Sequence, residues 1–245
     1  MKVRSTIDID LRRTDSLAPA ELAEIWAVTA RYIDTNRAVY ESKLHALPEV
    51  GLWRERGGAL VGLVGLDVYP VEWEGKTATI IFTANVVIEE RFRGRNLVLK
   101  TGLRILLREK LRRPRARAYW LFDTFSYQSY RILPRNLTEF WPRRAQVTPA
   151  PVARFVDHLA RRRYGDNWSP ATGVVRGSGQ KRLLPSAAPR DMPALVDPDA
   201  RFFDSANPGH RDGDMLVCLV PLSMRNILGA IGKAVRRSFA GCRPR

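Results

Sequence analysis

Several residue types that commonly reveal a protein's function are scarce in this chain of 245 residues. Two cysteines, Cys218 and Cys242, are too few for a disulfide framework or a cysteine-rich zinc site. The three histidines, His45, His158 and His210, lack metal-ligand spacing, so no metal is expected. The sequence has no apolar run of about 18 residues, and its first residues lack the apolar core of a signal peptide. These absences predict a cytoplasmic protein without a membrane-spanning helix.

Acidic residues are also few relative to basic ones. The chain has 41 Lys+Arg against 25 Asp+Glu, a formal net charge of +16. Such an excess indicates an acidic partner: nucleic acid, an anionic membrane, an acidic protein or a phosphorylated cofactor. Only seven of the cations are lysines, and an arginine-rich composition is also typical of GC-rich genomes. Charge alone therefore does not select among these partners.

Hydrophobic periodicity predicts a strand, two helices and an antiparallel meander in the first third of the chain. Apolar and polar residues alternate over residues 7–12, which is typical of a half-buried strand. Pro19 is well placed as the first residue of a helix, and a second helix is expected over residues 36–44. Three strands are expected over residues 50–56, 59–69 and 77–88, with turns at Gly57-Gly58 and at residues 72–76, and with Pro70 ending the second strand.

A polar loop over residues 89–96 then leads into an amphipathic helix over residues 97–112. The apolar face of this helix is expected to carry Leu99, Leu103, Leu106, Leu107 and Leu111. Its basic residues recur every four positions and form a ridge of Lys100, Arg104, Arg108 and Arg112. Because like charges at this spacing repel, an acidic partner or composition bias is expected to explain the ridge.

The rest of the chain predicts further helices and two strands. A strand over 116–122 precedes a short helix over 126–133 that Pro134 ends, and a basic helix is expected over 151–164. After a coil to residue 193 and a short helix from Asp197, a strand over 215–220 leads into a last helix. That helix, within residues 223–240, carries Lys233, Arg236 and Arg237 opposite an apolar stripe. Two interpretations stay open: the stripe packs in the core, or the helix contacts an anionic membrane surface.

Together the elements predict an α+β fold with a central, mostly antiparallel mixed sheet and flanking helices. Residues 1–140 are expected to form the core. Residues 141–245 are expected to complete the sheet and to add basic amphipathic helices, within one continuous domain.

The segment over residues 86–98, a strand end followed by a loop and a helix start, is the part of the sequence that indicates a binding site. A buried strand that feeds a Gly- and Arg-containing loop at a helix N-terminus is a ready anion site, because free N–H groups and the helix dipole favour phosphate. Arg93 and Arg95 would add charge-assisted hydrogen bonds. The loop has neither a Walker sequence nor a G-x-G-x-x-G fingerprint. It therefore indicates a pyrophosphate-bearing carrier other than a plain nucleotide.

The order of elements from Thr6 to about Asn136 resembles the GNAT superfamily of acyl-CoA-dependent N-acyltransferases. The segment VVIEERFRGRNLV over residues 86–98 is similar to the family's pyrophosphate motif, Q/R-x-x-G-x-G/A, which falls on residues 93–98. Arg93 matches the first position and Gly94 a common intervening glycine. Asn96 replaces the motif's glycine and Val98 its final Gly or Ala, so the motif is degenerate. Asn tolerates the left-handed conformation that glycine adopts, whereas Val98 adds bulk.

The resemblance implies a GNAT-like fold that binds acyl-CoA or an acyl-phosphopantetheine. The pantetheine arm would pair with the strand at Val86, Val87 and Ile88. The phosphates would bind at Arg93, Gly94, Arg95 and Asn96.

A carboxylate at the end of this strand often serves the family as general base, directly or through water, because an ammonium must lose a proton before it attacks a thioester. By position the candidates are Glu89, which is preferred, and Glu90. The alternative is that both carboxylates pair with Arg91 or Arg93 on the surface.

A tyrosine in the helix after the next strand commonly acts in the family as general acid toward the leaving thiolate. The usual position falls here on Leu133, which has no proton to give. Tyr130, and after it Tyr127, could substitute. The alternative for Tyr130 is a core or rim tyrosine.

The resulting hypothesis is an N-acyltransferase that moves an acyl group from acyl-CoA, or from acyl carrier protein docked on the basic ridge, to an amine on a small molecule or protein. A second hypothesis is a catalytically inactive GNAT-like domain that binds an acidic ligand or protein. A third is charge-driven nucleic-acid binding. Sequence-specific nucleic-acid recognition is not expected, since no helix-turn-helix or aromatic single-strand platform is legible.

Overall fold

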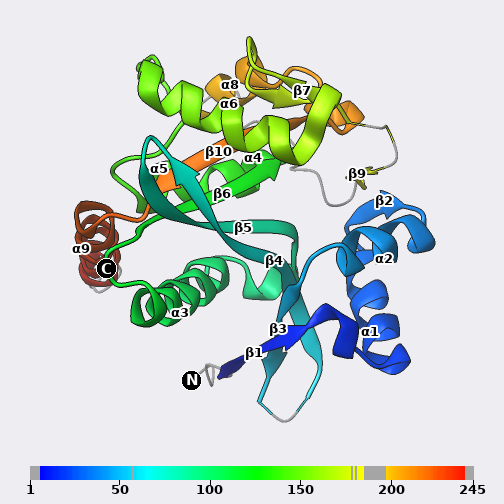
Figure 1. The fold of residues 1–245 in the computed structure, drawn as a ribbon. Coiled ribbons are helices and arrows are strands. Elements are labelled where there is room, and N and C mark those ends of the chain that lie inside the picture. Colours follow the sequence, from blue (N-terminus) through cyan, green and yellow to red (C-terminus); the bar gives the residue numbers. More distant parts are fainter. Residues whose placement is uncertain (1–5, 57, 178, 180, 185–196, 241–245) are drawn as a thin grey trace. The chain divides into compact units, whose positions relative to one another are not determined.

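The computed structural model describes residues 6–56, 58–177, 179, 181–184 and 197–240, without the side chains of residues 234, 235 and 237–240. Figure 1 shows the helices and strands along the chain. The chain divides into two units. The first unit comprises Met1–Ala116 with Gln180–Ala188, and the second comprises Arg117–Gly179 with Pro189–Arg245. The expectation that residues 141–245 complete the core of residues 1–140 within one continuous domain stays a prediction.

An antiparallel sheet in the order β1-β3-β4-β5 forms the centre of the first unit. Its elements are β1 (Ile7–Arg13), α1 (Pro19–Thr29), β2 (Ile33–Thr35), α2 (Arg37–His45), β3 (Glu49–Glu55), β4 (Leu60–Trp73), β5 (Lys76–Ile88), α3 (Leu97–Arg112) and β9 (Lys181–Leu183). The predicted order of strand, two helices, three strands and helix is confirmed. The short strands β2 and β9 were not predicted, and they pair with each other.

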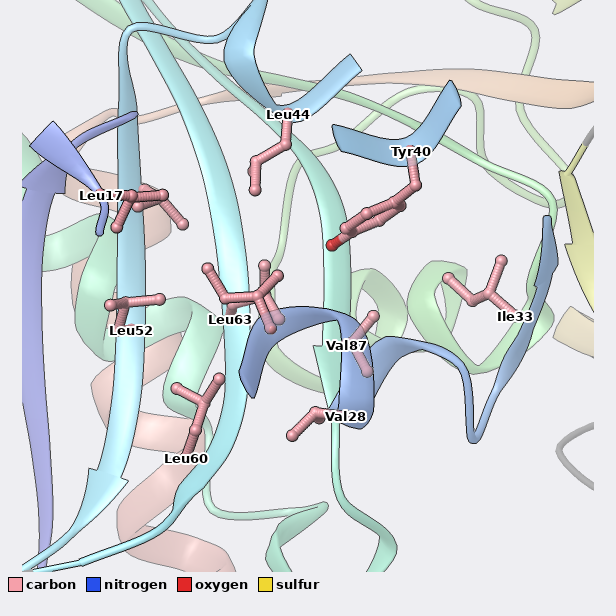
Figure 2. Close-up of a cluster of buried hydrophobic side chains, with 11 residues drawn as sticks. Leu17, Val28, Ile33, Tyr40, Leu44, Leu52, Leu60, Leu63 and Val87 are labelled. Atoms are coloured by element: carbon pink, nitrogen blue, oxygen red, sulfur yellow. The ribbon is translucent and has the colours of Figure 1, made fainter. Parts of the chain in front are cut away.

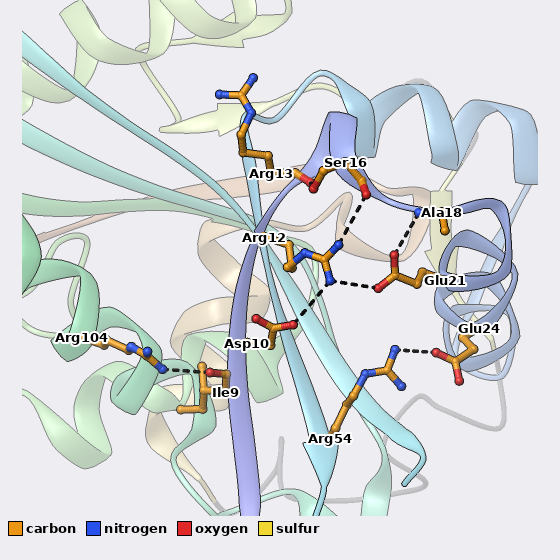
Figure 3. A network of polar contacts seen from close by, with 10 residues as sticks. All are labelled: Ile9, Asp10, Arg12, Arg13, Ser16, Ala18, Glu21, Glu24, Arg54 and Arg104. Carbon is orange, nitrogen blue, oxygen red and sulfur yellow. Dashed lines mark hydrogen bonds and ion pairs between the residues drawn. The ribbon is translucent and has the colours of Figure 1, made fainter. Parts of the chain in front are cut away.

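Local capping explains where the first two helices begin. Pro19 is the first residue of α1, and the carboxylate of Glu21 accepts a hydrogen bond of 2.9 Å from the N–H of Ala18 (Figure 3). The side-chain oxygen of Asn36 accepts hydrogen bonds from the first-turn N–H groups of α2, at 2.8 and 3.3 Å. Both helix starts follow from side chains that the sequence displays locally.

The β4–β5 hairpin corrects one prediction. Its two-residue turn is Glu74-Gly75, with φ of 49° and 72°, the left-handed pair that a tight hairpin needs. Pro70 does not end β4, which continues to Trp73. The pairing of β3 with β4 reaches only Leu66, so Pro70 pairs with β5 but has no β3 neighbour that needs its missing N–H.

Alternation along β3 sends side chains to opposite faces of the sheet. Leu52 joins the apolar cluster beneath α1 and α2, together with Leu44 and Leu63 (Figure 2). The next residue, Trp53, donates a hydrogen bond of 2.9 Å from its indole N–H to the hydroxyl of Thr101 on α3. The sheet therefore has α1 and α2 on one face and α3 on the other.

The buried face of α3 is not the predicted one. The helix buries Leu97, Val98, Thr101, Ile105, Leu106 and Glu109. Leu103, Leu107 and Leu111, which were expected to face the core, are exposed at 48%, 57% and 87%. Of the five leucines on the predicted face, only Leu106 is buried. The helix packs on the sheet through Thr101 and Ile105, beside Trp53, and this places most of the leucine row outside the contact.

Four antiparallel strands, in the order β6-β10-β8-β7, organise the second unit. Its elements are β6 (Arg117–Thr124), α4 (Tyr127–Tyr130), α5 (Ile132–Asn136), α6 (Ala150–Tyr164), β7 (Trp168–Ser169), β8 (Val174–Val175), α8 (Pro198–Ala206), β10 (Met215–Pro221) and α9 (Met224–Ala240). β7 and β8 lie where the sequence indicated coil. Pro134 lies inside α5, within the first turn, where its missing N–H is not needed. The predicted α+β class, with mostly antiparallel sheets and flanking helices, is confirmed.

The apolar cluster beneath α1 and α2 generates a stability prediction. Leu63 is fully buried at 0% exposure, so Leu63→Ala removes packing atoms and leaves a cavity. We expect a loss of about 2–5 kcal/mol in the free energy of unfolding, measured by chemical denaturation. Leu111→Ala on exposed α3 surface is the matched control and is expected to stay within about 0.5 kcal/mol. Equal losses in both variants would contradict the assigned core.

Candidate functional site

The candidate site begins with a bulge in β5. Register shifts along the β4–β5 ladder between the pairs Gly65↔Ala84 and Leu63↔Val87, and Asn85 in between has a φ of 52°. The side-chain oxygen of Asn85 accepts a hydrogen bond of 2.7 Å from Nζ of Lys181. The sequence analysis missed this bulge. Its signal was an asparagine within a β-branched run, since asparagine is one of the few residues that tolerates positive φ.

The predicted strand residues alternate as the pleat requires. Val87 is buried in the cluster beneath α1 and α2, while Val86 and Ile88 are half-buried on the alternate positions. The carbonyl of Ile88 accepts a hydrogen bond of 3.3 Å from Nε of Arg93. The end of β5 is thereby tied to the loop that follows it.

Glu89, the predicted base, is only 9% exposed at the end of β5. One carboxylate oxygen accepts a hydrogen bond of 2.7 Å from Arg31, and the other accepts one of 3.1 Å from Arg91. Arg91 also approaches the carboxylate of Glu55 at 3.4 Å. The pairing of Glu89 with Arg91 was the alternative left open by the sequence, whereas Arg31 was not foreseen.

Glu90 lies in a different setting. It is exposed, and its backbone N–H donates a hydrogen bond of 3.3 Å to the hydroxyl of Tyr32. The guanidinium of Arg93 lies 5.1 Å from the centre of the same tyrosine ring, within cation–π range. Tyr32, which follows α1, therefore contacts the loop at both Glu90 and Arg93. Of the two candidate bases, Glu89 is buried and Glu90 is exposed.

The loop between β5 and α3 is anchored by Phe92 and shaped by two left-handed residues. Phe92 is buried, with the guanidinium groups of Arg91 and Arg95 at 4.6 and 4.8 Å from its ring centre. Gly94 has a φ of 81° and Asn96 a φ of 58°. The predicted replacement of a motif glycine by Asn96 is thus conformationally tolerated, because asparagine enters the left-handed region at low cost.

The N-terminus of α3 completes this arrangement. Asn96 is its N-cap residue, yet among the described residues its side chain makes no capping hydrogen bond, and the first turn contains no acidic residue. The first-turn N–H groups of a helix carry partial positive charge. Val98, expected to add bulk at the loop, is buried on the packed face of α3. An anion could therefore meet N–H groups, the helix dipole, Arg93 and Arg95 in one place.

The basic ridge on α3 is largely engaged within the first unit. Arg104 donates a hydrogen bond of 2.8 Å to the carbonyl of Ile9 in β1 (Figure 3). Arg108 pairs with Glu49 at 2.8 Å, and both Arg108 and Arg112 pair with buried Glu109, at 3.2 and 3.1 Å. Two of the four ridge cations, Arg108 and Arg112, are thus paired with carboxylates of the first unit.

Tyr130, the predicted acid, lies in the core of the second unit. It is 0% exposed, its ring contacts Phe140 and Phe203, and its hydroxyl donates a hydrogen bond of 3.2 Å to the carbonyl of Pro142. Burial raises the pKa of the Tyr130 hydroxyl above its usual value. This is the environment of a core tyrosine, the alternative that the sequence left open.

Tyr127, the second candidate for the acid, and Leu133, the position where the family usually has its tyrosine, lie in the same unit as Tyr130. The hydroxyl of Tyr127 donates to the carboxylate of Asp197, the N-cap of α8, and burial together with this carboxylate raises the pKa of Tyr127. Leu133 is fully buried in α5. Neither of the two tyrosines in this region has an unengaged hydroxyl.

Three other side chains of the second unit, those of Asp123, His210 and Cys218, are also engaged or buried. Asp123 accepts a hydrogen bond of 2.7 Å from the hydroxyl of Tyr164. His210 lies 3.1 Å from Asp204. Cys218 is fully buried in β10, and burial raises the pKa of its thiol.

Two kinds of feature are absent from the part of the chain that the structure describes. No cluster of three or more His, Cys, Asp or Glu side chains there is arranged to hold a metal ion. No helix there is long and apolar enough to cross a membrane.

Comparison with known proteins gives matches among solved structures. No protein-family model matches the chain, and no curated protein does. A probable N-acyltransferase of Enterococcus faecalis is 16% identical at a TM-score of 0.37, over 52% of this chain and 31% of that one. A GNAT family N-acetyltransferase of Escherichia coli, solved with CoA, is 16% identical at a TM-score of 0.36, over 58% and 78%. A Trypanosoma brucei acetyltransferase is 17% identical at a TM-score of 0.37, over 58% and 100%.

The match to the first of these structures thus spans under a third of its length, whereas the other two are matched over most of theirs. The solved structures to which about half of this chain is similar are GNAT and other N-acyltransferase structures.

Proposed function

We propose that this chain is an N-acyltransferase that moves an acyl group from acyl-CoA to an amine. The observation that carries the proposal is the continuous run from the β5 bulge to the start of α3. It places a strand end, a nearly buried carboxylate and an arginine-bearing loop within twelve residues, Asn85 to Asn96. Each part meets one requirement of the reaction.

Phosphate binding is assigned to the loop and the helix start. The left-handed conformations of Gly94 and Asn96 shape the backbone before α3, whose first turn carries no acidic side chain to repel an anion. Arg93 and Arg95 supply charge-assisted hydrogen-bond donors. The chemistry of this donor set fits the pyrophosphate of CoA, and the end of β5 at Val86 to Ile88 is the proposed neighbour of the pantetheine arm.

Glu89 is the proposed base. Its two oxygens have one guanidinium partner each, and a carboxylate offers about four acceptor sites, so it can still accept a proton from an ammonium, directly or through water. The freed amine then attacks the thioester carbonyl carbon and a C–N bond forms. The nitrogen loses its second proton to water, and the C–S bond breaks to release the thiolate. Because a thiol has a pKa of about 8.5, solvent can protonate this leaving group. The proposal therefore gives Tyr130 no proton-transfer role.

The proposed donor is acyl-CoA in preference to acyl carrier protein. Docking of the carrier was inferred from the basic ridge, but Arg104, Arg108 and Arg112 are engaged by Ile9, Glu49 and Glu109. The loop arginines do not distinguish the two donors, since both bear phosphate. Because two of the four ridge cations are already paired with carboxylates, the ridge offers less free charge to an acidic protein.

A catalytically inactive binding domain is the second candidate function. The observation that favours it is the pairing of Glu89 with both Arg31 and Arg91, a purely structural use of the carboxylate. The two functions separate when purified protein is incubated with acetyl-CoA, long-chain acyl-CoA or acyl carrier protein and a panel of amines. Thiol release above the uncatalysed rate supports the enzyme. CoA binding without turnover supports the binding domain.

The loop generates a binding prediction. Arg93→Ala and Arg95→Ala each remove a proposed donor to phosphate, and each should weaken CoA binding about tenfold or more in isothermal titration. Arg93→Lys keeps the charge and should lose less than Arg93→Ala.

The matched control is Arg115→Ala, an exposed arginine that follows the opposite end of α3. It should leave CoA affinity unchanged. Equal affinity in all variants would remove the loop from the proposed site.

The catalytic assignments generate a second prediction. Glu89→Gln keeps the shape of the side chain but removes the base, so turnover should fall by about 100-fold or more while CoA affinity is retained. Tyr130→Phe loses only the hydrogen bond to Pro142 and should keep turnover, with about 1 kcal/mol less stability. Both variants are compared with wild type by thiol release and denaturation. A Tyr130→Phe enzyme that folds but does not turn over would reinstate the tyrosine as the acid.

A further inference from the structure

The last helix, α9, is attached to the second unit through its polar side. Asn226 is 1% exposed and its amide is fully used. Its oxygen accepts hydrogen bonds from the N–H and hydroxyl of Thr138, at 3.0 and 2.7 Å, and from the N–H of Glu139 at 2.8 Å. Its nitrogen donates to the carbonyls of Glu139 and Pro221, both at 2.7 Å. This side chain fixes the start of the helix.

Two further positions on the same side continue the attachment. At Gly229 an added Cβ would come within 2.8 Å of a methyl carbon of Thr138, so the helix backbone approaches closely there. One turn later, Nζ of Lys233 donates to the carbonyls of Pro134 and Leu137 of the α5 region, at 3.2 and 2.6 Å. Asn226, Gly229 and Lys233 follow the helical spacing of three and four, so they form one contact face.

The apolar stripe of α9 faces away from this contact. Met224, Leu228 and Ile231 are 67%, 61% and 55% exposed, and their spacing of four and three puts them on one line along the helix. Core packing of the stripe, one of the two interpretations of the sequence, is therefore wrong for these three residues. A helix normally buries its apolar side against the protein, and here the polar side is the buried one.

The charges on α9 indicate what kind of partner covers the apolar stripe of Met224, Leu228 and Ile231. The segment Met224–Ala240 contains no Asp or Glu. Arg225 and Arg236 are exposed and lie eleven positions apart. This spacing is about three helical turns, so both lie on the same flank of the stripe. Two copies of a chain with net charge +16 would repel each other when such faces meet. The partner should therefore be apolar beneath the stripe and anionic beside it.

We propose that α9 is an interfacial helix that lies on an anionic membrane surface. A straight row of three apolar side chains with cations at its flank suits a flat boundary between acyl chains and charged headgroups. In this arrangement Met224, Leu228 and Ile231 enter the acyl region and Arg225 and Arg236 contact headgroup phosphates. The attachment through Asn226 and Lys233 leaves the stripe in place without rearrangement of the unit.

Sedimentation of the full chain with lipid vesicles tests this proposal. Vesicles of phosphatidylcholine alone are compared with vesicles that also contain phosphatidylglycerol. We expect binding to the mixed vesicles and little binding to the neutral ones. The double variant Leu228→Gln with Ile231→Gln should bind about tenfold more weakly or worse. Arg225→Gln with Arg236→Gln should also bind more weakly and should lose part of the salt dependence.

The matched control takes two exposed leucines of similar exposure from another helix. Leu103→Gln with Leu107→Gln on α3 should bind like wild type, and circular dichroism should show that all variants fold. Absence of binding to the mixed vesicles would overturn the proposal, as would equal loss in the α3 and α9 variants. A dimer in solution that disappears with Leu228→Gln and Ile231→Gln would instead assign the stripe to a second copy. None of these measurements depends on acyl transfer, so the proposed function is tested separately.

Discussion

The carboxylate of Glu89, carried to a nearly buried position at the end of β5, sets the geometry on which the candidate site depends. A charge so enclosed is stable only with close partners, and Arg31 and Arg91 provide them from either side. Arg91 in turn stacks on buried Phe92, which anchors the loop from within. The loop that carries Arg93 and Arg95 is therefore anchored at the end of β5, by Glu89 with its two arginines and by the buried ring of Phe92.

The net charge of +16 does not describe how the individual basic residues are used in the structure. Several arginines that form a regular row in the sequence of α3 are turned toward Ile9, Glu49 and Glu109 in the structure. They stabilise the packing of the helix against the sheet. The cations that retain a functional interpretation are those at a loop or a helix flank: Arg93, Arg95, Arg225 and Arg236. A net charge counts all of these groups equally, although several of them are paired within the protein.

Two helices of this protein present apolar residues to solvent for different reasons. In α3 the packed face is chosen by Thr101 and Ile105, which meet the sheet beneath Trp53, and the leucine row falls to one side. In α9 a buried asparagine satisfies five hydrogen bonds, and this network selects the polar face for contact. Apolar periodicity identifies both helices correctly, but the direction of packing is decided by partners outside the helix.

The sequence by itself determined the order of the longer helices and strands, most of their bounds, and the loop at residues 93–96, because each depends on neighbours within a few positions. The short strands β2, β7, β8 and β9 were not among them. The tertiary structure decided the rest. Arg31 reaches Glu89 across 58 positions and Lys181 reaches Asn85 across 96, and β2 finds β9 far along the chain. The enclosure of Tyr130 likewise depends on Phe203 and Pro142. A local sequence pattern predicts which positions of a helix or strand are buried. The residue that a buried group contacts depends on which distant segments of the chain pack beside it.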